Sequence, residues 1–251
     1  FPHSVALPGE KTYGQKQQYH VYAMGVDVAS GSPSGDYSAF CVMDVTQKKS
    51  PVVVETGYHR MPPAEFSQEV LRVAKKWDPL VVVESNTYGL SVLEYLMAQG
   101  WAYIFRRTQY DKMASRWLER VGFNTNANTR PVMLSRLHEY VSRGWLVIKD
   151  ERMKCEVNTF IYNDNGRPEA ASKKHDDMVM AYALTLMGID QIDPVKDEIQ
   201  ARKPETVAEM LQFERTTGKV YRKHHADKHS DMWGTPRDQA SLMDSALNNS
   251  S

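Results

Sequence analysis

The spacing of apolar and polar residues changes along the chain, and each change predicts a different element. Three β-rich segments, 20–29, 37–46 and 51–59, are separated by the turn signals SGSPSGD and QKKS and predict an antiparallel meander. A helix is predicted over 62–77, because it opens with proline and its apolar residues recur at helical spacing. The short apolar run 80–83 is typical of a central strand covered on both faces.

The second half of the pattern predicts fewer strands and longer helices. We expect a helix over 88–99, a strand over 101–105, and a long helix over 129–143 with proline early and glycine after its end. Strand 157–162 and the stretch after Arg167 flank Asn-Asp-Asn-Gly, a strong hairpin turn signal. A final helix is predicted to start near His175.

This order of elements predicts an α/β fold. We expect a central mixed five-stranded sheet whose first three strands are antiparallel, with helices on both faces and an added β-hairpin. The first and fourth strands should lie side by side at its centre. Residues 1–18 are predicted to be a linker, 19–190 one domain, and 191–251 a polar, partly disordered tail with a partner-docking patch near Met210.

Composition limits the partners and the compartment. Thirty-one basic and 31 acidic residues leave no net charge, so any nucleic-acid-binding surface must be local. Two isolated cysteines exclude a zinc finger or disulfide scaffold. No apolar run approaches the ~20 residues of a membrane span and no signal peptide is visible, so we expect a soluble protein of the cytoplasm. Because the first residue is Phe1, we expect a part of a longer polypeptide.

Acidic residues far apart in the sequence should meet at one end of this sheet. Asp27 lies on the first strand, Glu84 ends the fourth, and Asp176 and Asp177 begin the last helix. Carboxylates suit Mg²⁺ or Mn²⁺, and two such ions can catalyse phosphodiester hydrolysis. We assign the bridging position to Asp27, because an aspartate inside an apolar strand is rarely buried without a partner.

The other acids have structural alternatives. Glu84 could be a cap or a loop anchor, and one aspartate of the pair could serve only as a helix cap. We favour Asp176 as the third ligand, since it lies about one turn from the inward-facing residues of the helix, and keep Asp177 as the alternative. His175 and Asp36 are auxiliary candidates.

Four strings in this order resemble the C-terminal nuclease domain of tailed-phage terminase large subunits over roughly residues 20–188. They are GVDVASGSPSGDYSAF, VVVESNTYG, TRPVMLSRLHEYVSRGWLVIKDERMKCEVNTFIYNDNGRPEA and HDDMVMAYAL. The resemblance implies an RNase H-like fold and an endonuclease that cuts concatemeric double-stranded DNA during genome packaging. It also implies two Mg²⁺ or Mn²⁺ ions, held by Asp27, Glu84 and an aspartate of the HDD string.

The resemblance further implies a packaging ATPase domain, a terminase small subunit and a portal as partners. The chain contains no GxxxxGK[ST] phosphate-binding motif, so the ATPase domain is absent from it. Local basic groups should contact DNA, and we expect the hairpin near Gly166 to gate the site. The candidate DNA-binding residues are Arg106, Arg107, Lys112, Arg130, Lys173 and Lys174.

Three other functions fit part of the pattern. A Holliday-junction resolvase or transposase core would share the acids but need a different DNA structure. An actin-like or Hsp70-like nucleotide-binding domain shares the element order, yet it needs a second phosphate loop that is not visible here. A DNA-binding module that had lost activity would have no need for all three acidic positions.

Overall fold

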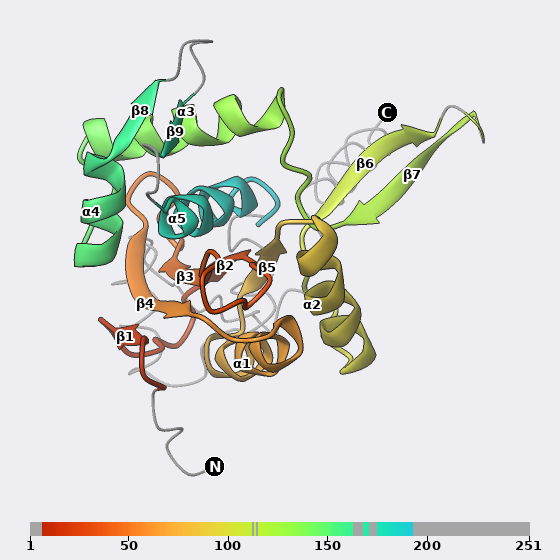
Figure 1. Cartoon of the computed structure of the whole chain (residues 1–251), viewed down its shortest axis with the longest axis horizontal. Coiled ribbons are helices and arrows are strands. Elements are labelled where there is room, and N and C mark those ends of the chain that lie inside the picture. Colours follow the sequence, from red (N-terminus) through yellow and green to blue (C-terminus); the bar gives the residue numbers. More distant parts are fainter. Residues whose placement is uncertain (1–6, 112, 114, 163–167, 171–174, 193–251) are drawn as a thin grey trace, which may run out of the picture. The chain divides into compact units, whose positions relative to one another are not determined.

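A mixed sheet with the strand order β1-β4-β3-β2-β5 forms the centre of the fold (Figure 1). β2, β3 and β4 pair antiparallel, and β5 runs parallel to β2. The structure is a computed structural model that describes residues 7–111, 113, 115–162, 168–170 and 175–192. The five strands are β1 (Lys11–Thr12), β2 (Tyr22–Asp27), β3 (Ser38–Asp44), β4 (Val52–His59) and β5 (Leu80–Val83).

Helices cover both faces of this sheet (Figure 1). One face packs against α1 and α2, and the other carries α5, against which α3 and α4 pack. Two separate hairpins, β6–β7 and β8–β9, complete the fold. The helices are α1 (Pro63–Trp77), α2 (Thr87–Ala98), α3 (Thr129–Ser142), α4 (Glu151–Asn158) and α5 (Asp177–Gly188), and the hairpin strands are β6 (Arg106–Asp111), β7 (Arg116–Val121), β8 (Phe160–Tyr162) and β9 (Pro168–Ala170).

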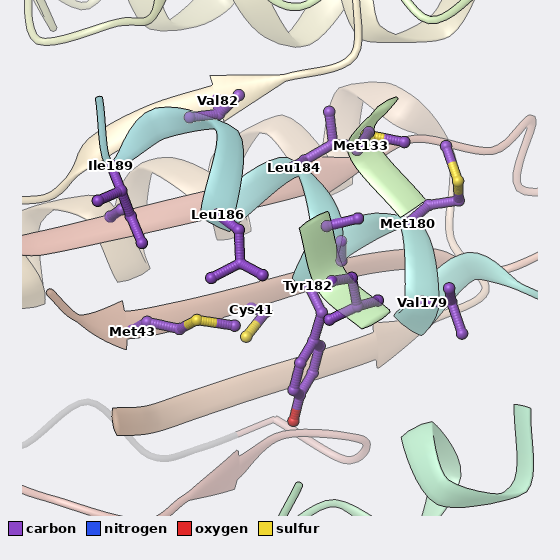
Figure 2. Packing of buried hydrophobic residues seen from close by; sticks show 14 of the residues in the cluster. Cys41, Met43, Val82, Met133, Val179, Met180, Tyr182, Leu184, Leu186 and Ile189 are labelled. Atoms are coloured by element: carbon purple, nitrogen blue, oxygen red, sulfur yellow. The ribbon is translucent and has the colours of Figure 1, made fainter. Parts of the chain in front are cut away.

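The two-residue period of β2 sorts its side chains between two cores. Tyr22, Met24 and Val26 belong to the core beneath α1 and α2, whereas Ala23 belongs to the core beneath α5. Apolar residues of β3 and β5 continue this second core toward the buried side chains of α5 (Figure 2). The last residue of β2, Asp27, has the parity of Ala23 and therefore lies on the α5 side.

Gly25 allows α5 to lie directly on β2. A Cβ atom at this position would meet the carbonyl oxygen of Ala181 at 2.1 Å. The Gly25 N–H donates to Thr185 Oγ1 at 3.0 Å, and this hydroxyl lies 3.0 Å from the Cys41 carbonyl oxygen on β3. Backbone packing at a glycine thus fixes the height of α5 above the sheet.

The predicted fold class is confirmed, with corrections to single elements. The meander, the helix over 62–77, the strand over 80–83 and the final helix are observed. The fifth strand of the sheet, however, is β1, inside the predicted linker, and β5, predicted to lie at the centre, is the last strand of the order, beside β2. The predicted strand 101–105 contributes an isolated bridge, between Val81 and Ile104, and α4 begins before the predicted strand 157–162.

The remaining differences concern two segments of the chain. Residues 106–121, for which the sequence predicted no helix or strand, form the β6–β7 hairpin. The predicted Asn-Asp-Asn-Gly turn and the tail beyond Ile192 lie outside the described residues, although β8 and β9 on either side of that turn do pair. In the part of the chain that the structure describes, every helix falls short of the length or apolarity required to cross a bilayer.

Substituting Gly25 tests the close packing of α5. Gly25→Ala should lower the free energy of unfolding by about 2 kcal/mol or more, because the added methyl group displaces helix backbone rather than a flexible side chain. Urea denaturation followed by circular dichroism measures this change. Gly14→Ala is the control, since its Cβ would contact Val54 at an ordinary 3.4 Å. Equal effects of both substitutions would contradict the argument.

Candidate functional site

Asp27 and Glu84 lie side by side where β2 and β5 end. Val26 is in register with Val83 in the parallel pair, and the Glu84 N–H donates to the Val26 carbonyl oxygen at 3.1 Å. Leu80 and Val82 face the α5 core, so the two-residue period places Glu84 on that same side. Both carboxylates therefore occupy the same end of the sheet, beneath the N-terminus of α5.

Asp176 and Asp177 enter this site from α5. Asp177 is buried, and its Oδ2 accepts from the Tyr37 N–H at 3.1 Å and from the Tyr58 hydroxyl at 3.4 Å. Asp176 precedes the helix and its Oδ2 accepts from Arg130 of α3. The structure thus places all four of these carboxylates at the same end of the sheet, near Asp27.

Crowding of the carboxylates changes their ionisation. Burial raises the pKa of Asp27 well above its usual value, and the nearby charges of Glu84, Asp177 and Asp176 raise it further. The pKa of Asp177 rises to about 6, mainly through burial. Carboxylates that oppose one another's ionisation would be stabilised by a cation placed between them, so these residues fit Mg²⁺ or Mn²⁺.

The auxiliary candidates Asp36 and His175 also lie at this site. One ligand atom from each of Asp36, His175 and Asp177 falls within 4.8 Å of the others. His175 Nδ1 is 3.1 Å from Asp36 Oδ1 and 3.7 Å from Asp177 Oδ2, and its ring packs edge-on against Tyr37. Asp177 therefore belongs both to the group around Asp27 and to this second group.

Sequence reasoning missed Glu156, which holds the first turn of α5. Its Oε2 accepts from the Met178 N–H at 2.8 Å and the Val179 N–H at 3.0 Å, directly after Asp177. Burial is the main cause that raises the pKa of this carboxyl to about 7. The signal that could have located it is Asp150, a helix N-cap that accepts from the Arg152 N–H and marks the start of α4.

Asn86 is a second missed residue, and it orients Glu84. Its side-chain N–H donates to Glu84 Oε2 at 3.0 Å, while its Oδ1 accepts from the Gly89 N–H as the N-cap of α2. A Cβ atom on Gly89 would lie 1.8 Å from the Glu84 carbonyl oxygen, so only glycine fits there. The string ESNTYG therefore contains the candidate ligand Glu84, the N-cap of α2 that orients it and the glycine that leaves room for both.

The predicted DNA-binding residues differ in how close they lie to the acids. Arg107 Nη1 donates to Ser85 Oγ at 3.2 Å, next to Glu84, and Arg130 pairs with Asp176. Arg106 lies on the face of the β6–β7 hairpin opposite to that of Arg107, and it pairs with Glu119. The remaining candidates, Lys112, Lys173 and Lys174, lie outside the described residues.

Comparison with known proteins identifies the relatives of this fold. A family model described as the terminase RNaseH-like domain matches residues 24–187, more than half of the chain. Among curated proteins, no sequence matches the chain.

Solved structures are similar over most of the chain. Crystal structures of the large terminase nuclease from thermophilic phage G20c align with TM-scores of 0.56 with bound cobalt and 0.54 with bound magnesium, at 17% and 20% identity. Each alignment covers 73% of this chain and 89% of that one. The large terminase nuclease domain of Thermus phage P74-26 aligns with a TM-score of 0.54 at 19% identity, covering 74% and 89%. At these identities the likeness shows the fold.

Divalent cations should stabilise the native protein through the carboxylate cluster. Adding Mn²⁺ or Mg²⁺ to protein freed of metal should raise Tm, because a bound cation removes the repulsion around Asp27; at 100 times Kd the gain is about 2.7 kcal/mol. Scanning calorimetry with and without EDTA measures it. Asp27→Asn should lose most of the increase, whereas Glu139→Gln on the exposed side of α3 should keep it. A metal-induced Tm increase in Asp27→Asn equal to that of the native protein would exclude the site.

Glu156 should make stability depend on pH. The pKa of Glu156 in the folded protein, about 7, exceeds the 4.5 of an unperturbed glutamate, so between these values the folded state holds a proton that the unfolded state releases. As pH rises from ~4.5 to ~7, the free energy of unfolding should therefore fall by about 3 kcal/mol relative to that of Glu156→Gln. Above pH ~7 it should stay level. Urea denaturation in EDTA across this range tests it. Parallel curves for the two proteins would refute the assignment.

Proposed function

Because this chain belongs to the terminase RNaseH-like domain family, we propose that it cuts concatemeric double-stranded DNA during viral genome packaging, by metal-dependent phosphodiester hydrolysis. As a terminase nuclease domain it is an endonuclease. One observation carries the proposal for this chain. Three separate elements bring carboxylates to one end of the sheet, and their charges act together on Asp27.

The residues that would hold two Mg²⁺ or Mn²⁺ ions are Asp27, Glu84 and the aspartates of α5, with Asp36 and His175 as auxiliary groups. When bound, such ions supply an activated water and stabilise the leaving oxygen. The G20c nuclease carries magnesium in one of its crystal structures, which supports the same metal here. The chain's own groups hold these ligands in place: Asn86 orients Glu84, and the Tyr37 N–H orients Asp177.

The third ligand can now be argued from the structure. The sequence favoured Asp176, whose carboxylate accepts from Arg130. Asp177 is the more buried of the two, and its charge raises the pKa of Asp27 more than that of Asp176 does. We propose Asp177 as the principal ligand, with Asp176 held by Arg130 beside it.

The substrate and partners follow from the same proposal. Arg106, Arg107 and Arg130, together with Lys112, Lys173 and Lys174, are proposed to contact DNA phosphates. The packaging ATPase domain, the small subunit and the portal are the proposed partners, with the chain acting in the host cytoplasm. We propose residues 19–190 as the nuclease domain and 191–251 as a partner-docking tail.

Plasmid cleavage tests the assignment. Native protein with Mn²⁺ or Mg²⁺ should nick and linearise supercoiled plasmid, and EDTA should abolish this activity. Asp27→Asn, Glu84→Gln and Asp177→Asn should each lower the initial rate by at least about 100-fold, because loss of a metal ligand costs more than loss of a residue that only orients one. Asp176→Asn should have a smaller effect. Rates come from gel densitometry.

Matched controls separate catalysis from folding and from substrate type. Glu139→Gln, purified in the same way, should cleave at the native rate, and all variants should melt cooperatively. Cleavage that survives EDTA, or native-level cleavage by Asp27→Asn, would rule out the metal-dependent mechanism. Selective cutting of a four-way junction over linear duplex would instead favour a resolvase.

A further inference from the structure

We propose that the β6–β7 hairpin is an arm that lies between the two backbones of duplex DNA, in the major groove next to the cleaved phosphate. Arg107 and Arg120 at its base bind the backbone of the cleaved strand. Tyr110 and Trp117 near its tip contact the opposite side of the major groove. The inference rests on the proposed function, because it assumes that duplex DNA is the substrate.

The hairpin has two faces of different chemistry, set by its register. Arg107 is directly opposite Arg120, and Asp111 is opposite Arg116, so one face carries three arginines. Tyr110 lies directly opposite Trp117 on the other face. Their rings meet edge-on with centroids 5.3 Å apart.

Like charges directly opposite each other destabilise a sheet unless an anion lies between them. Burial lowers the pKa of Arg107, and the nearby charge of Arg120 lowers it further. Residues 106–121 contain five basic and two acidic side chains, an excess of three positive charges in a chain without net charge. The polyanionic backbone of DNA supplies the missing negative charge.

Within the part of the chain that the structure describes, the aromatic face of the hairpin stays exposed. Trp117 is 68% exposed and Tyr110 46%, and Met113 at the turn is fully exposed. A two-stranded ribbon is marginally stable by itself in water, so large apolar residues on its surface point to a ligand that covers them. Aromatic side chains with arginines on the reverse face suit the base edges and phosphates of DNA.

The base of the hairpin is tied to the end of β5 that carries Glu84. Phe123 donates its N–H to the Val83 carbonyl oxygen at 2.8 Å, and its own carbonyl accepts from the Ser85 N–H at 2.7 Å. Arg107 also donates to Ser85 Oγ and to the Gly122 carbonyl oxygen. The arginine face therefore begins beside the carboxylates, and the ribbon projects away from the sheet (Figure 1).

The dimensions match the major groove and exclude the minor groove. Six residues per strand span about 20 Å. A ribbon with side chains on both faces is about 10 Å thick, which fits a groove about 12 Å wide but not one about 6 Å wide.

DNA binding by hairpin variants tests this arm. The parent protein is Asp27→Asn with Mg²⁺, which keeps the DNA uncut, and fluorescence anisotropy measures its affinity for a labelled duplex and a single strand over a series of salt concentrations. Arg120→Ala should weaken duplex binding about fivefold to tenfold near 0.1 M salt and lower the salt slope by about one. Trp117→Ala should weaken duplex binding several-fold, leave the slope unchanged and spare the single strand, while Trp117→Phe should retain most of the affinity. Arg143→Ala, an exposed arginine at the end of α3, is the control.

The outcomes separate this inference from the proposed function. An unchanged slope in Arg120→Ala, or equal losses on duplex and single strand in Trp117→Ala, would overturn the arm while the native protein still cleaves plasmid. Native protein that neither binds nor cleaves DNA would instead overturn the proposed function. In the cleaving background, Arg120→Ala should raise KM and leave kcat close to native; a fall in kcat alone would also contradict the arm.

Discussion

The contact between α5 and the glycine of β2 is the constraint on which the site depends. Gly25 has no side chain, so the helix backbone at Ala181 and Thr185 rests on the strand itself. The Thr185 hydroxyl then joins that helix to both β2 and β3 through their backbones. Because of this contact, the N-terminus of α5 lies over the C-terminal ends of β2 and β5. With a larger residue at position 25, the helix would move outward and its two aspartates would leave the carboxylates of the sheet.

The same contact between α5 and β2 brings negatively charged side chains close together, and their repulsion opposes folding. Four carboxylates meet in a half-buried space, and among the described residues the guanidinium of Arg130, paired with Asp176, balances only part of that charge. Glu156 adds another buried carboxyl beside Asp177, although two backbone N–H groups of α5 compensate it in part. The protein therefore gives up stability at this end of the sheet, as expected where a cation is to be bound.

Segments with a regular spacing of apolar residues could be predicted from the sequence. Segments that depend on contacts with distant parts of the chain could not. The meander and the strand 80–83 are apolar enough to define themselves, and their order implied that Asp27 and Glu84 would meet. The β6–β7 hairpin escaped prediction because both of its faces are polar or exposed, so no alternation was visible. β1 exists because the edge of β4 accepts it, a long-range cause that two residues cannot encode. The choice between Asp176 and Asp177 depends on contacts with Tyr37 and Arg130, which helical spacing alone does not contain.

The backbone hydrogen bonds that join Phe123 to Val83 and Ser85 have a mechanical consequence. Because they lie on either side of Glu84, the backbone at the base of the ribbon and the backbone that carries this carboxylate are joined at the end of the strand. A tilt of a few degrees at the base displaces the tip far more than it displaces Glu84. A displacement of the tip conversely reaches the base with reduced amplitude, and the base is hydrogen-bonded through Phe123 to both chain neighbours of Glu84.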